Sequence, residues 1–264
     1  MSATPLKIAA VSFFNTKPLI HYLLDRPGLE VEVDVPSRLI DRLRSGQADA
    51  ALVPVVDWAT SAEDTVIVPD GCIASDGTTL TVRVFCRCRP ENVSVLYADT
   101  DSHTSVMLAR VLWQRAYNRQ IRIEPLCSME TARQAEAVLL IGDKVIAQWR
   151  EPWPHQVDFG QLWKDLTGLP FVFAVWVARK GVDTETVGPL LNDARDRGCA
   201  DARRLATLYG AERGWPLPVA EEYLTRYMKY RLDEASLRGL QTFLDMAAEF
   251  GLLQPVEALS HGRR

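Results

Sequence analysis

The order of apolar segments predicts an α/β fold with two lobes and a helical C-terminal region. Short apolar strand-like runs alternate with helix-like segments through the first two thirds of the chain. A charged stretch with a proline, residues 87–91, interrupts this alternation. Beyond Gly181, apolar residues recur at helical spacing. A chain of 264 residues suits one large domain or two modest lobes, so we expect lobe 1 to comprise 1–88 and 179–264, and lobe 2 to comprise 89–178.

The first part of the chain predicts a right-handed βαβ unit. Leu6–Phe13 has the continuous apolar character of a strand buried on both faces, and Leu29–Val35 alternates as a half-exposed strand does. Ser37 is expected to cap a short helix that ends at Gly46. A third strand should then run to Pro54, and this order favours a parallel arrangement.

Polar residues follow the first strand where a helix begins. The turn SFFNTKP, residues 12–18, places Asn15 beside the expected helix start. Ligands of open α/β sheets bind outside the carboxyl ends of the strands. Asn15 is therefore either a ligand contact or a helix cap.

A hairpin is expected next. Apolar residues up to Ser75 lead into an Asp-Gly turn, and a strand follows from Leu80 to Cys86. Thr81 adds a hydroxyl near this turn, although threonine is also common in strands for structural reasons.

The stretch VLYADTDSHTSVMLARVLW, residues 95–113, predicts a strand, a polar turn and a helix start. One capping residue would be enough to accept a hydrogen bond from the first turn of the helix. The turn carries four hydroxyls, on Thr100, Ser102, Thr104 and Ser105. Hydroxyls beside the free N–H groups of a first helical turn bind an anion well. We therefore expect a ligand site here.

The second lobe repeats this order. Strands over 121–126 and 137–141 flank a helix over 130–136, and Gly142 and Asp143 form a turn at the last strand's carboxyl end. The stretches 158–163 and 167–178 are the most hydrophobic of the chain and predict a buried strand. Its aromatic residues Phe171, Phe173 and Trp176 are each either part of an aromatic pocket wall or core. Helices are expected over 187–191, 204–208, 223–230 and 237–250.

The composition excludes several classes of function. A net charge of −4 and scattered basic residues speak against nucleic-acid binding, and no apolar run is long enough to cross a membrane. The N-terminal residues lack a signal-peptide pattern, and five cysteines form no disulfide framework, so a cytoplasmic protein with free thiols is expected. No metal-ligand cluster or phosphate loop is present, so we expect no metal and no cofactor.

Six segments, SFFNTKPL, GQADAALVP, CIASDG, DTDSHTSV, LLIGD and TGLPFVFAVW, together resemble the chorismate dehydratase family of menaquinone biosynthesis by the futalosine pathway. The similarity runs from about Lys7 to Arg179. It implies the fold of type II periplasmic binding proteins, with a ligand cleft between two α/β lobes. It also implies that chorismate loses water to give 3-[(1-carboxyvinyl)oxy]benzoate.

The resemblance implies catalytic positions at Asn15 and Asp143. It places substrate-binding residues at Ser12, Pro54, Ser75, Thr81, Ser102, His103, Thr104, Ser105, Gly142 and Phe171. The general base stays open between Asp143, His103 and the substrate's own enolpyruvyl carboxylate. The family usually has serine at Thr81, arginine at His103 and alanine at Lys144, so a related lyase with another enolpyruvyl or futalosine-type substrate is one alternative. A non-catalytic protein that captures a small carboxylate is another.

Overall fold

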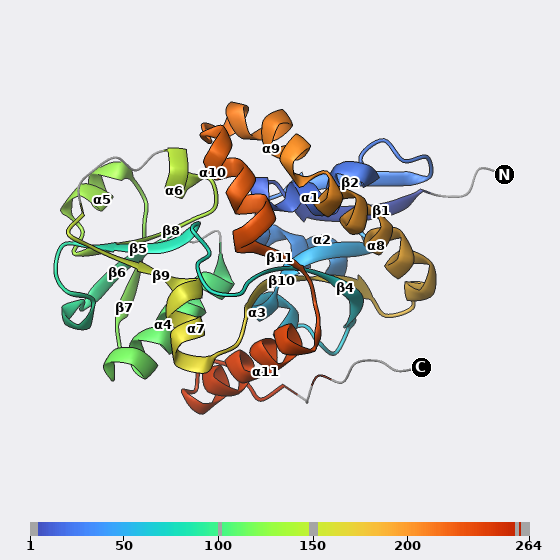
Figure 1. Ribbon diagram of the computed structural model, residues 1–264. Helices are drawn as coiled ribbons and strands as arrows, with labels where there is room; N and C mark the ends of the chain where they lie inside the picture. The colour runs from blue at the N-terminus through green and yellow to red at the C-terminus, as the bar shows by residue number, and fades with distance from the viewer. Residues whose placement is uncertain (1–4, 100–101, 148–152, 257–258, 260–264) are drawn as a thin grey trace.

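The computed structural model describes residues 5–99, 102–147, 153–256 and 259. Two sheets lie side by side, each with its own helices (Figure 1). The predicted two-lobed α/β architecture with a helical C-terminal region is confirmed.

The larger sheet has six strands in the order β11-β4-β10-β3-β1-β2. Its strands are β1 (Leu6–Val11), β2 (Leu29–Asp34), β3 (Ala50–Pro54), β4 (Thr65–Ser75), β10 (Phe171–Arg179) and β11 (Met228–Arg231). The strand β1 pairs in parallel with both β2 and β3, which confirms the predicted βαβ unit. The strand β10 returns antiparallel between β3 and β4.

Helices cover both faces of this sheet. They are α1 (Lys17–Ile20), α2 (Leu39–Arg44), α3 (Val55–Ala59), α8 (Thr184–Ala200), α9 (Ala202–Gly210), α10 (Leu217–Glu222) and α11 (Glu234–Glu249). The helix α8 packs against β4, whereas α3 and α11 pack against β10. In Figure 1, α9 and α10 lie above the sheet and α3 and α11 lie below it.

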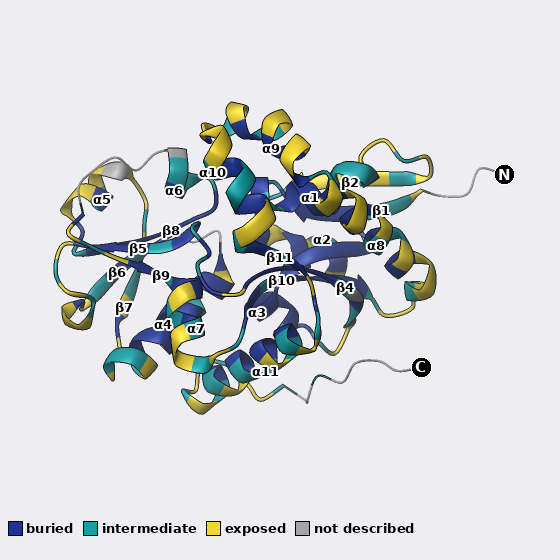
Figure 2. Ribbon diagram, in the orientation of Figure 1, coloured by how far each residue is buried: buried dark blue, intermediate teal, exposed yellow. Residues whose placement is uncertain are grey.

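The smaller sheet has five strands in the order β7-β6-β8-β5-β9. Its strands are β5 (Val82–Cys86), β6 (Val95–Ala98), β7 (Arg122–Pro125), β8 (Ala137–Ile141) and β9 (His155–Asp158). Its helices are α4 (His103–Tyr117), α5 (Met129–Gln134), α6 (Lys144–Ala147) and α7 (Phe159–Thr167). Buried residues fill the inner strands β3 and β8, the edge strands β2 and β7 are only partly buried, and exposed residues gather on the outer helix faces (Figure 2).

The chain crosses between the sheets at residues 76–81 and again at 168–170. The predicted hairpin is therefore wrong, because β4 pairs within the larger sheet while β5 pairs with β8 and β9. The charged residues 87–91 mark the end of β5 rather than a crossing. Residues 82–86 therefore belong to the sheet of the second lobe, and residues 171–178 belong to the sheet of the first. This differs from the expected division of the chain. We propose that the two crossings are the limits of the lobes.

Three local predictions are also wrong. Ser37 lies within a 3-10 turn, Pro36–Arg38, and no side chain caps α2. Residues 158–163 begin the helix α7, which Asp158 caps through a bond from the Gln161 N–H. The expected helix over 223–230 is a π-helical turn, Tyr223–Tyr227, followed by β11, because β4 offers the chain a strand partner there.

Candidate active site

A cavity lies between the two sheets, and the centre of a water-sized sphere can move through about 60 Å³ of it. Six residues that were predicted for the site line it: Asn15, Pro54, Thr81, Ser102, Ser105 and Gly142. The carboxyl ends of β1, β3 and β8 meet at the cavity through Val11, Pro54 and Ile141, as the rule for open α/β sheets predicts.

The first turn of α4 supplies hydroxyls and backbone donors to the cavity. Ser102 caps the helix: its Oγ accepts the Ser105 N–H at 3.2 Å and donates to Ser105 Oγ at 2.9 Å. Both serines are buried and line the cavity. The positive end of a 15-residue helix thus faces the cavity through two hydroxyls, an arrangement that favours an anionic ligand. Thr100, the fourth hydroxyl of this turn, lies outside the described residues.

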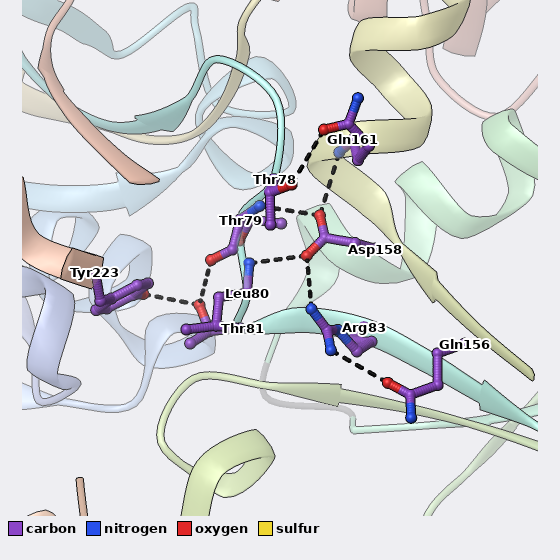
Figure 3. Close-up of polar contacts among 9 residues, drawn as sticks. All are labelled: Thr78, Thr79, Leu80, Thr81, Arg83, Gln156, Asp158, Gln161 and Tyr223. Carbon is purple, nitrogen blue, oxygen red and sulfur yellow. Dashed lines mark hydrogen bonds and ion pairs between the residues drawn. The ribbon is translucent and has the colours of Figure 1, made fainter. Parts of the chain in front are cut away.

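Asn15 and Thr81 both line the cavity, and Thr81 is the last residue of the first crossing. Asn15 lies in a 3-10 turn, Phe14–Thr16, directly after β1, and its Oδ1 accepts the Thr16 hydroxyl at 3.4 Å. The Thr81 hydroxyl lies 2.7 Å from the hydroxyl of Tyr223 (Figure 3). Asn15 is therefore not a side-chain cap of the following helix, whose start shows no side-chain cap bond.

Asp143 follows the lining residue Gly142 but does not itself line the cavity. Its Oδ1 accepts the Phe14 N–H at 3.4 Å and the Trp215 indole N–H at 3.1 Å, and Arg213 Nε lies 3.7 Å from its Oδ2. Burial raises the pKa of this carboxyl above its usual range, although these donors and Lys17 act in the opposite direction. Asp143 thus joins β8 of the smaller sheet to the first turn and the C-terminal region of the larger lobe.

His103 points away from the cavity, where its Nδ1 lies 2.6 Å from Asp57 Oδ1 in α3. The hydrogen bond to Asp57 raises the pKa of the imidazole, and burial opposes this only in part. Thr104, the next residue, is also outside the lining, and its Oγ1 accepts the Val56 N–H at 3.4 Å. The start of α4 therefore presents its serines to the cavity and uses His103 and Thr104 to contact α3.

The remaining predicted site residues do not line the cavity. Ser12 is half-buried and its N–H bonds the Asp34 carbonyl, whereas Ser75 is fully buried behind the lining. Phe171 packs edge-on against Trp163 and Phe243 in the core. Lys144 donates to Asp99 at 2.7 Å, so its charge is paired.

Sequence reasoning did not assign ten lining residues to the site, although it had considered Phe173 for an aromatic pocket wall: Val11, Phe13, Pro36, Ile73, Thr79, Val82, Ile141, Phe173, Ala174 and Met228. Most are apolar and carry no chemical signal beyond their place at a strand end. Thr79 is the exception, because its buried hydroxyl has no hydrogen-bond partner within the described residues. The whole lining is uncharged, so a bound anion is held by neutral donors and a helix end.

Among the described residues, no group of three or more His, Cys, Asp or Glu is arranged to hold a metal ion. None of the helices in the described part of the chain has the length and apolarity needed to cross a membrane. The described chain has its cysteines as free thiols, and burial raises the pKa of the Cys199 thiol to about 11.

Two α/β lobes, two chain crossings and a cavity between them define the class of periplasmic-binding-protein-like folds. Solved structures agree. A protein from Archaeoglobus fulgidus matches with a TM-score of 0.71 at 15% identity, covering 96% of this chain and 100% of that one. The periplasmic aliphatic sulphonate binding protein from Escherichia coli matches with a TM-score of 0.65 at 15% identity, covering 100% of this chain and 96% of its own.

The family is also shown by sequence. The family model described as menaquinone biosynthesis matches residues 6–249, and this chain belongs to that family. A chorismate dehydratase from Thermus thermophilus is 27% identical over 263 residues, which is 91% of this chain and 94% of the relative.

Proposed function

We propose that this protein is a chorismate dehydratase, a hydro-lyase that converts chorismate to 3-[(1-carboxyvinyl)oxy]benzoate. The observation that carries the proposal is an uncharged cavity between the lobes, which the first turn of α4 lines with Ser102 and Ser105. The family and the relative from Thermus thermophilus support the choice of reaction.

The cavity suits a dianion with an apolar ring. Ser102, Ser105 and the free N–H groups of α4 hold one carboxylate, each hydrogen bond to a charged group contributing about 1.5 to 3 kcal/mol. Phe173 and Ile73 offer apolar surface to the ring. Asn15 lines the cavity beside the crossing, where its amide orients the departing hydroxyl or the second carboxylate.

The reaction removes the ring proton from the carbon that bears the enolpyruvyl ether and expels the neighbouring hydroxyl as water. Asp143 and His103 both have their polar atoms engaged outside the cavity lining. We therefore assign the base to the substrate's own enolpyruvyl carboxylate, which travels with the substrate into a site without charged side chains. The protein's task is then to hold the dianion in position and to exclude water, and aromatisation of the ring drives the reaction.

The test is turnover of chorismate by protein treated with a chelator, followed by liquid chromatography and mass spectrometry. Loss of one water is expected, with the rate reduced about 100-fold by Asn15→Ala, the size of effect expected when a group that positions the substrate is lost. Asn92→Ala is the matched control, because Asn92 is exposed on a surface turn. Chorismate that binds and returns unchanged after denaturation of the protein would overturn the enzyme proposal and favour a carboxylate-binding protein.

A further inference from the structure

Tyr223 lies behind the cavity wall with its hydroxyl directed at two lining residues, Thr81 and, as a weaker contact, Asn15. The side chain is 1% exposed, and its ring stacks on Trp215 with centroids 4.7 Å apart and on Phe14 with centroids 6.1 Å apart. Its hydroxyl lies 2.7 Å from Thr81 Oγ1 (Figure 3). Tyr223 opens the π-helical turn that precedes β11, and π-helical turns recur at functional sites.

The backbone before Thr81 is also held. Asp158 accepts the Thr79 N–H at 2.9 Å and the Leu80 N–H at 2.8 Å, and Leu80 adopts a φ of 65°. A positive φ is unfavourable for a branched side chain and persists only where neighbouring contacts enforce it. Thus Asp158 fixes the main chain of the crossing at the point where Thr81 enters the cavity wall (Figure 3).

The hydroxyl of Thr81 has one competing acceptor. The Thr79 carbonyl lies 3.5 Å from Thr81 Oγ1, at the outer limit of a hydrogen bond. When Tyr223 donates to Thr81 Oγ1, the Thr81 oxygen uses a lone pair on the side that faces Tyr223. The Thr81 hydroxyl proton must then point away from Tyr223. Burial raises the pKa of the Tyr223 hydroxyl, so it stays protonated and able to donate.

We propose that Tyr223 is a positioning residue for the dehydration. Its hydroxyl donates to Thr81 and turns the Thr81 proton into the cavity, toward an oxygen of the bound substrate. The inference rests on the proposed function, since the substrate oxygen is that of chorismate. It makes the chain Tyr223 to Thr81 to substrate a directed series of hydrogen bonds, in which each donor polarises the next.

The test uses Tyr223→Phe in the full chain, with chorismate turnover and calorimetric binding measured together. The variant keeps the ring contacts with Phe14 and Trp215. We expect kcat to fall about three- to tenfold, the factor for one neutral hydrogen bond. KM and Kd should change less than about twofold, because Ser102 and Ser105 still hold the carboxylate.

A double-mutant cycle with Thr81→Val separates positioning from packing. If Tyr223 acts through Thr81, the double variant loses about as much as Thr81→Val alone. Thr81→Ser keeps the hydroxyl and should restore the sensitivity to Tyr223→Phe. Tyr230→Phe is the control: Tyr230 is also buried, and its hydroxyl has no partner within the described residues, so kcat should not change.

Two outcomes overturn the inference, and they are distinguishable. A Tyr223→Phe variant with unchanged kcat, or with a loss that adds in full to that of Thr81→Val, would show that the hydroxyl does not act through Thr81. A wild-type chain that neither binds nor dehydrates chorismate would overturn the proposed function and this role with it.

Discussion

Two contacts beside the cavity join the lobes, and their chemistry differs. At the first, Asp143 accepts hydrogen bonds from Phe14 and Trp215, whose side chains are 0% and 4% exposed. At the second, His103 meets Asp57, and the imidazole is 50% exposed. The first contact should therefore contribute mainly to stability, because buried donors depend on it. The second should contribute little to stability but make the joint between the lobes sensitive to pH.

The largest effect is expected from Asp143→Ala. The substitution leaves the Phe14 N–H and the Trp215 indole N–H without their acceptor in buried surroundings. The free energy of unfolding should fall by about 2 to 4 kcal/mol, measured by urea denaturation. Asp143→Asn keeps an acceptor oxygen and should cost less at neutral pH. Equal losses in the two variants would show that the hydrogen bonds to Trp215 and Phe14 are not what stabilises this contact.

Gly142→Ala should rank second. Gly142 has a φ of +61°, and a Cβ there would lie 3.1 Å from the Phe13 ring. Backbone strain and this contact together should lower the free energy of unfolding by about 1 to 3 kcal/mol. Gly28→Ala is the control, because Gly28 has a φ of +80° and nothing within 4 Å of its added Cβ. If both variants lose the same stability in thermal unfolding, the approach of Phe13 is not part of the cost.

Ser102→Ala tests the start of α4, midway between the two contacts. Loss of a cap oxygen should lower the free energy of unfolding by about 1 kcal/mol. It should also weaken chorismate binding in calorimetric titration. Ser128→Ala is the control. It removes the cap of α5, where Ser128 Oγ accepts the exposed Thr131 N–H at 3.1 Å. Weakened binding in both variants would argue against a carboxylate at the α4 turn.

His103→Gln should have the smallest effect, below about 1 kcal/mol, because the imidazole is half exposed and a glutamine amide can still donate to the buried Asp57 carboxylate. Asp57 raises the pKa of His103 above its ordinary 6.5, so the stabilisation is fully present below that value and is lost as the pH rises through the raised pKa. The difference in stability between wild type and variant should therefore be larger at about pH 5.5 than at about pH 8.5. A difference that does not change over this range would show that the His103 contact does not titrate.

Much of the fold followed from local patterns. Three strands, β1, β2 and β8, could be predicted because the burial of a strand determines the apolar pattern of its own residues. The pattern is continuous in β1 and β8 and alternates in β2. Local sequence does not predict which distant strands pair with each other. A turn signal at Asp76 and Gly77 predicted a hairpin, but β10, nearly one hundred residues later in the chain, is the strand that lies beside β4.

The site residues also divide into those that local sequence predicts and those that it does not. Ser102 and Ser105 were predicted because hydroxyls at a helix start have a chemical reason to be there. Of the aromatic residues considered for the pocket wall, Phe173 lines the cavity and Phe171 does not. Residues two apart share a face in a regular strand, but the pairing of β10 with β4 shifts register between Val172 and Ala174, which interrupts that pattern. Tyr223 carried no signal, since its hydroxyl reaches Thr81 across 142 positions of sequence.

Trp215 offers a way to follow opening of the cleft by fluorescence. Its indole is buried at the seam of the lobes, donates to Asp143 and stacks on Tyr223. Opening of the cleft would separate this indole from Asp143 while it stays packed on Phe14 and Tyr223, so its fluorescence emission would report loss of that hydrogen bond. Because the chain has seven tryptophans, comparison with Trp215→Phe would isolate this signal in rapid mixing without an attached dye.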